Sequence, residues 1–95
     1  MSAYVIAEVE VTDQVTFEAY RRQVPATLQQ YGGEYIIRGG EMETIEGSWK
    51  PKRLVVIKFR TMDQAKKWYN SPEYSAPMKL RKLSTKSNVL FVEGV

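Results

Sequence analysis

Residues 53–59, RLVVIKF, decide the fold of this 95-residue chain. β-Branched and aromatic side chains dominate the segment, and this composition predicts a β-strand. Successive side chains of a strand point to opposite faces of its sheet. Leu54 and Val56 on one face are as apolar as Val55 and Ile57 on the other. Both faces of this strand should therefore be covered, and we expect the strand to lie in the centre of the sheet.

Further strands are predicted on either side of this segment. Residues 4–11, YVIAEVEV, alternate with small apolar residues on one face. Residues 89–93, VLFVE, form the last strand and are again apolar on both faces. Residues 34–40, EYIIRGG, and 41–47, EMETIEG, both have strand-like composition. The Gly39-Gly40 pair between them predicts a bend or a tight hairpin.

A long helix is predicted after the first strand. Thr12 or Asp13 can act as its N-cap, and Gly32 and Gly33 end it, because glycine adopts the left-handed conformation of a C-terminal cap without steric cost. Pro25 should bend this helix without ending it, since the apolar stripe continues in register on both sides. That stripe consists of Phe17, Tyr20, Val24, Leu28 and Tyr31.

Two shorter helices are predicted after the central strand. Thr61 and Gln64 have the spacing of a capping box, in which each side chain bonds to the backbone N–H of the other residue. Ser71 is the expected cap of the next helix, with Pro72 at its first position. This order of elements predicts one domain covering residues 1–95. Its fold class is α+β: a ferredoxin-like antiparallel sheet with helices on one face.

The face of the sheet that the helices leave bare is predicted to pair with a second copy of the chain. That face carries Leu54, Val56, Leu90 and Val92, which form an apolar surface. Burial of roughly five aliphatic side chains at about 1.5 to 3 kcal/mol each is comparable to the net stability of a whole domain. We therefore expect a two-fold homodimer formed through the sheet face.

The composition excludes several kinds of chemistry. The chain has no cysteine and no histidine, and so it lacks thiol nucleophiles, disulfides, histidine bases and the usual zinc and haem ligands. Glutamates at alternate strand positions, such as Glu8 with Glu10, are typical of a solvated strand face rather than a metal site. We expect no metal and no cofactor. No leader or membrane-spanning pattern is present, which predicts a cytoplasmic protein with no membrane partner.

The charge of the chain is unevenly distributed. Residues 1–47 carry three basic and eight acidic side chains, whereas residues 48–95 carry eleven basic and three acidic ones. A solvated surface whose halves attract each other explains this division without a ligand. RNA-recognition modules share this strand order, but they stack bases on aromatic residues of the sheet. The central strand here is aliphatic, and a nucleic-acid-binding module is therefore the least favoured alternative.

A cluster of candidate ligand-binding residues lies in and beside AKKWYNSPEYSAPMKLR, residues 65–81. Tyr74 and Arg81 share one face of a helix, and Tyr69 precedes them on the adjoining helix. A guanidinium beside two phenols could hold a carboxylate or an enolate while the rings pack on an apolar body. The alternative is that Arg81 forms an ion pair with a local acid such as Glu73 and that the tyrosines cover the edge of the core.

Tyr35, Arg38 and Trp49 complete the candidate set. Arg38 ends a strand beside two glycines, where a backbone can approach a ligand closely, and the alternative is an ion pair with Glu41 or a neighbouring glutamate. Trp49 lies in a polar loop, and an interface or a lid is its expected place. The predicted pocket lies between the sheet and its helices and is lined by Tyr35, Arg38, Tyr69, Tyr74 and Arg81.

Several motifs of the chain resemble the family called domain of unknown function 1330, within the dimeric α/β-barrel superfamily. They are YVIAEVEV, VPATLQQYGGEYIIRGG, the EG before Trp49, PKRLVVIKF, and AKKWYNSPEY followed by LR. The resemblance implies a ferredoxin-like subunit whose sheet pairs with that of its mate. The wider superfamily includes cofactor-independent monooxygenases, haem-degrading enzymes and chlorite dismutases. The last two rely on a haem-binding histidine, which has no counterpart in this chain.

Two functions are therefore compared. The first is a small homodimer that binds an anionic or aromatic metabolite in the pocket, where any chemistry would be cofactor-free, with arginine and phenol stabilising a developing anion. The second is a non-enzymatic structural or interaction dimer whose polar cluster stabilises the fold. The residues identify neither a substrate nor a catalytic base, and so they leave open whether the protein is an enzyme.

Overall fold

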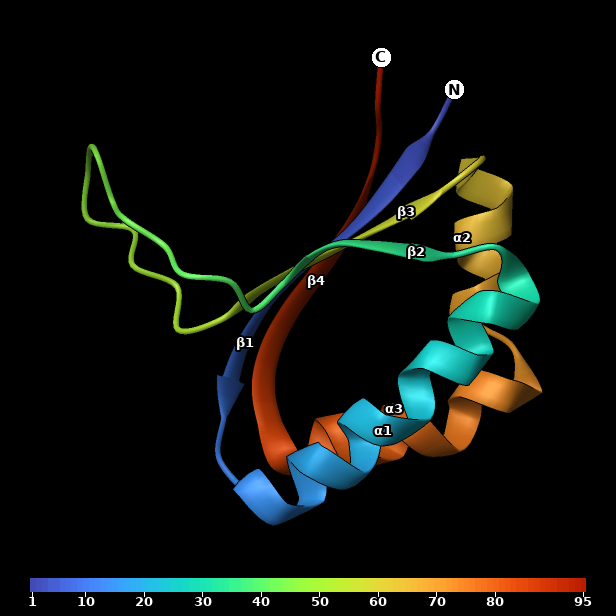
Figure 1. Cartoon of the computed structure of the whole chain (residues 1–95), viewed down its shortest axis with the longest axis horizontal. Helices are drawn as coiled ribbons and strands as arrows, with labels where there is room; N and C mark the ends of the chain where they lie inside the picture. The colour runs from blue at the N-terminus through green and yellow to red at the C-terminus, as the bar shows by residue number, and fades with distance from the viewer.

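The computed structural model describes residues 1–95 as a four-stranded antiparallel sheet with three helices on one side (Figure 1). The strand order is β2-β3-β1-β4, which places the predicted central strand inside the sheet. The predicted ferredoxin-like α+β class is confirmed. The elements are β1 (Ala3–Val11), α1 (Gln14–Tyr31), β2 (Glu34–Arg38), β3 (Leu54–Phe59), α2 (Met62–Tyr69), α3 (Pro72–Ser84) and β4 (Thr85–Glu93).

The two faces of the sheet have different surroundings. In β1, Val5 lies between Ile57 of β3 and Phe91 of β4, and these side chains belong to the helix-covered face. The other face, the open face, carries no helix (Figure 1). Its apolar residues are Ile6, Ile37, Leu54, Val56, Leu90 and Val92. No helix of the structure has the length and hydrophobicity of a membrane span.

Trp68 of α2 is the largest side chain at the centre of the core. It is 1% exposed, and its indole Nε1 donates a hydrogen bond to Thr27 Oγ1 of α1 at 2.9 Å. Its ring packs 4.2 Å from the ring of Tyr74, centroid to centroid. A buried indole N–H needs an acceptor, and here the helix that covers the sheet supplies one.

Side-chain caps fix where the helices begin. Asp13 and Thr61 accept hydrogen bonds from the backbone N–H groups of Thr16 and Gln64, as the sequence predicts. The reciprocal half of the predicted capping box is wrong, however. The Gln64 amide donates instead to the carbonyl of Tyr31 at 2.7 Å, because the last carbonyls of α1 have no partner within their own helix.

One predicted strand does not form, and the predicted start of another is wrong. Residues 41–47 form no strand, and every residue from 40 to 50 is exposed. Figure 1 shows this loop, residues 39–53, projecting away from the sheet and the helices. The strand predicted to form a hairpin with residues 41–47 is β2, and β2 pairs with β3 instead. β4 begins at Thr85 rather than at residue 89, because Thr85–Asn88 pair with the last residues of β1 although their polar side chains resemble a loop.

Removal of the cap of α3 should reduce stability. The Ser71 hydroxyl is buried, accepts from the Tyr74 backbone N–H at 3.1 Å and donates to the Trp68 carbonyl at 2.7 Å. Ser71→Ala should lower the free energy of unfolding by about 1 kcal/mol, measured by urea denaturation. Ser75→Ala, at an exposed position of the same helix, should leave it unchanged or slightly raised. Equal effects of the two substitutions would contradict the assignment of Ser71 as the cap.

Candidate anion-binding site

A cavity of about 50 Å³ lies between the helix-covered face of the sheet and the helices. Its apolar floor is formed by β1, β3 and β4, through Val5, Ala7, Val9, Val55, Ile57 and Val89. Its polar groups are Tyr20, Tyr35, Tyr69, Tyr74, Arg21, Arg38, Arg53 and Arg81. None of its 16 lining residues is an aspartate or a glutamate. The cavity therefore concentrates positive charge over an apolar surface.

Arg81 is the most deeply buried of these cations. It lies in the last turn of α3, is 7% exposed, and donates from Nη2 to the Tyr69 hydroxyl at 3.2 Å. No carboxylate lies within ion-pair distance of its guanidinium. The predicted alternative, an ion pair with Glu73, is wrong because that carboxylate accepts a hydrogen bond from Tyr31 at 2.7 Å. An unpaired buried charge is destabilising by several kcal/mol, which makes Arg81 a strong site for an anion.

The tyrosines around Arg81 are hydrogen-bond donors rather than counter-ions. The hydroxyls of Tyr20 and Tyr74 lie 2.8 Å apart. Burial raises the pKa of both phenols, and it also raises the pKa of Tyr35. All three are therefore neutral at neutral pH, and none can supply the negative charge that Arg81 lacks. A bound anion would meet both a guanidinium and phenolic O–H groups.

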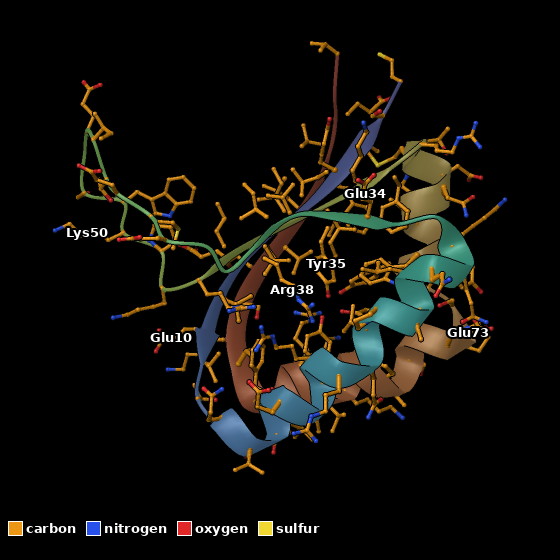
Figure 2. The ribbon with its side chains drawn as sticks, in the orientation of Figure 1. Glu10, Glu34, Tyr35, Arg38, Lys50 and Glu73 are labelled. Atoms are coloured by element: carbon orange, nitrogen blue, oxygen red, sulfur yellow. The ribbon has the colours of Figure 1, made fainter.

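A second group of cations, Arg21, Arg38 and Arg53, lies at the α1 and β2 side of the cavity. Figure 2 shows Tyr35 and Arg38 on the helix side of β2. Arg38 lies 4.4 Å from the centroid of the Tyr35 ring and donates to the Arg21 carbonyl at 3.1 Å. Burial, followed by the charges of Arg21 and Arg38, lowers the pKa of Arg53. The three side chains are thus close enough to repel one another.

These three arginines have little compensation from acids. Arg21 forms an ion pair with Glu18 at 3.5 Å, and no carboxylate lies within ion-pair distance of Arg38 or Arg53. The predicted alternative, an ion pair between Arg38 and a glutamate across the hairpin, is therefore wrong. The Nε atoms of Arg21 and Arg53 are buried and have no hydrogen-bond acceptor in the protein. Two guanidinium donors thus remain available beside the cavity.

Five of the six residues singled out from the sequence line this one cavity: Tyr35, Arg38, Tyr69, Tyr74 and Arg81. Trp49 does not line it. This side chain is 63% exposed, and its Nε1 donates to Glu8 Oε2 at 2.8 Å. Glu8 belongs to the open face of the sheet, and Trp49 is therefore placed beside the expected interface rather than over the cavity.

Sequence analysis missed Tyr20, Arg21 and Arg53. Tyr20 belongs to the apolar stripe of α1, and a tyrosine in such a stripe looks like core. Arg53 has the same alternation phase as Val55 and Ile57. A period of two therefore places it on the helix-covered face, and this signal could have been used. Arg21 directly follows Tyr20, and nothing in its local pattern distinguishes it from the neighbouring surface arginine.

The buried phenols should resist ionisation at alkaline pH. Their folded-state pKa values are raised, so the stability they contribute is complete below the unfolded value of 10.0 and is lost as pH rises above it. Absorbance of phenolate should therefore appear at higher pH in the native protein than in guanidinium chloride. Tyr20→Phe should remove part of this difference. Coincident titration curves for native and unfolded protein would contradict the buried, neutral assignment.

Several solved structures share the fold of this chain. A protein of unknown function from Rhodopseudomonas palustris superposes with a TM-score of 0.81 at 12% identity, covering 99% of this chain and 82% of that chain. A cofactor-independent oxygenase from Streptomyces nogalater gives 0.69 at 10% identity, covering 99% and 93%. A dimeric protein of unknown function with a ferredoxin-like fold, from Bacteroides fragilis, gives 0.65 at 14% identity, covering 98% and 96%.

These similarities show the fold alone. No curated protein matches the chain in sequence. The model of the family described as "Domain of unknown function (DUF1330)" matches residues 2–95. The match covers nearly the whole chain, in agreement with the resemblance of its motifs, and the chain therefore belongs to the domain of unknown function 1330 family.

Proposed function

We propose that this chain is a homodimeric binding protein that holds a small organic anion in the cavity, with Arg81 as the principal contact. The observation that carries this proposal is a guanidinium that is 7% exposed and has no carboxylate partner. A bound carboxylate can accept two parallel hydrogen bonds from a guanidinium. The neutral hydroxyls of the surrounding tyrosines provide further donors.

The size of the cavity favours a small anion over an aromatic one. An apolar cavity of about 150 Å³ is known to admit benzene, and the cavity here has about one third of that volume. It corresponds to space for roughly three to five water molecules at about 10 to 15 Å³ each. This space can enclose a carboxylate group with a short aliphatic part of a ligand, and it is too small to enclose an aromatic ring.

Chemistry at this site would be limited to stabilising a developing oxyanion. Guanidinium and phenol groups aimed at one point are suited to that role. The cavity is lined by no carboxylate and no histidine, and burial raises the pKa of Tyr20, Tyr35 and Tyr74. A general base with a pKa near neutrality is what proton abstraction requires, and the lining residues contain none. The geometry thus supports binding more strongly than catalysis.

The open face supports the homodimer. Leu90 and Val92 of β4 are 55% and 42% exposed, and Ile37 of β2 is 39% exposed. Such a contiguous apolar surface on a sheet is characteristic of a protein interface. Trp49 stands beside it, anchored to Glu8, and aromatic residues are enriched in interfaces. The Bacteroides fragilis protein of similar fold is described as dimeric, which is consistent with this arrangement.

A charge placed on the open face should separate the dimer. Leu90→Lys would bury an ammonium group at the centre of the proposed interface, at a large desolvation penalty. Light scattering across a size-exclusion peak should give twice the chain mass of 11.0 kDa for the parent protein and a single chain mass for the variant. Leu83→Lys, at an exposed position of α3, should remain dimeric. A parent protein with the mass of one chain at micromolar concentration would contradict the dimer.

Substitution of Arg81 should abolish anion binding without loss of stability. Arg81→Met keeps the length of the side chain and removes an unpaired buried charge, so the free energy of unfolding should stay the same or rise. Calorimetric titration with malonate, acetate and pyruvate should detect binding to the parent protein and none to the variant. Lys82→Met, at an exposed neighbouring position, should bind like the parent.

The same variant separates the binding protein from the structural dimer. If the polar cluster only stabilises the fold, Arg81→Met should lower the free energy of unfolding by about 2 kcal/mol or more. None of the three anions should then bind to the parent protein. That combination would contradict the proposed function.

A further inference from the structure

We infer that the ligand is a dianion, and specifically a short aliphatic dicarboxylate of two to four carbons that bridges two cationic poles of the cavity. The inference rests on the proposed function, since it concerns the same site. It adds a second recognition element, formed by Arg21, Arg38 and Arg53, which sequence analysis largely missed. The first pole is Arg81 with its phenols.

The two poles come from different parts of the fold. Arg81 is held by α3 and touches Tyr69 at the end of α2. The second pole is assembled from α1, the end of β2 and the residue before β3, and its members are fixed by contacts within the protein. Arg38 is held by the Arg21 carbonyl and the Tyr35 ring. Both poles line the same cavity, so one ligand can contact both.

The second pole is built closely against the backbone. Gly39 has a φ of 69°, a backbone conformation that favours glycine, and the guanidinium of Arg53 lies beside it. The guanidinium of Arg53 is also 5.4 Å from the centroid of the Phe17 ring. Arg53 thus packs beside Gly39 and Phe17, and its buried Nε lacks an acceptor.

Charge balance favours a dianion. The cavity holds four guanidinium groups, and the only acid within ion-pair distance of any of them is Glu18, on Arg21. A monoanion bound to Arg81 would leave Arg38 and Arg53 without a counter-ion. A ligand with a second carboxylate satisfies both poles at once, and the donors that have no acceptor in the protein can then bond to it.

The surface between the poles favours a dicarboxylate over a compact dianion such as phosphate. The floor of the cavity is formed by valine, alanine and isoleucine side chains from three strands. A methylene chain packs on such a floor, whereas phosphate would present oxygen to it and lose hydrogen bonds to water. The volume of about 50 Å³ can enclose only the carboxylate at Arg81 and the adjoining carbon, and the second carboxylate would lie at the solvent-accessible side of the cavity, where Arg38 is exposed. A short chain with charged ends meets both conditions.

The test is isothermal titration calorimetry at neutral pH and low salt with oxalate, malonate, succinate, acetate and inorganic phosphate. At least one of the three dicarboxylates should bind about tenfold or more tightly than acetate and phosphate, as expected for one additional charge-assisted contact. Arg53→Gln should reduce the affinity for that dicarboxylate about tenfold and leave acetate within about twofold. Arg60→Gln, an equal change of charge at an exposed position directly after β3, should change neither.

The ratio of dicarboxylate to acetate affinity is the decisive readout, because a general loss of stability would reduce both affinities together. Arg21→Gln provides a second variant of the same pole and should lower the same ratio. Equal affinities for acetate and the dicarboxylates, or a ratio unchanged in both variants, would overturn the inference and leave the proposed function intact. Preferential binding of phosphate would do the same. Absence of binding by every anion would remove the proposed function as well.

Discussion

The two apolar faces of β3 are the constraint on which the rest of this structure depends. A strand of this kind is stable only where both faces of its sheet leave water. Helices α1, α2 and α3 cover one face, and Trp68 and Tyr74 fill the space between that face and the helical layer. Nothing in a single chain covers the other face. The cavity and the proposed dimer interface thus lie on opposite sides of the same sheet.

Position on the helix-covered side gives the cavity its chemistry. There the sheet contributes only apolar side chains, and the polar groups come from the helices and the strand ends. Burial keeps the tyrosines protonated, so positive charge dominates and acids are absent. Arg81, which is 7% exposed, is unfavourable there without a partner. The proposed dianion would supply the negative charge that Arg81 and Arg53 lack within the protein.

The sequence predicts the fold well because the fold depends on local signals. Alternation located β1 and strand-like composition located the other three strands, and the side chains of Asp13, Thr61 and Ser71 marked the helix starts. The predicted hairpin strand at residues 41–47 failed because strand-like composition does not supply a pairing partner. The polar start of β4 was missed for the opposite reason: pairing with β1, and not composition, makes it a strand.

The candidate site was predicted only in part, because its members come from distant segments. Tyr74 and Arg81 could be found because they share one helix face. Arg21 and Arg38 come from the acidic half of the chain and Arg53 and Arg81 from the basic half, so charge distribution along the sequence gave no indication of the cluster. Only the tertiary packing of α1 against β2 and β3 shows that these cations share a cavity.

The most direct test of the central claim is the side-chain ¹H–¹⁵N spectrum of the arginine guanidinium groups, recorded with and without malonate. The burial of Arg81 and its lack of a carboxylate partner predict that its Nε–H signal shifts on saturation with malonate, as those of Arg21 and Arg53 also should. The signal of exposed Arg60 should stay in place. An Arg81 signal that does not move at saturating malonate would contradict the assignment of this cavity as an anion-binding site.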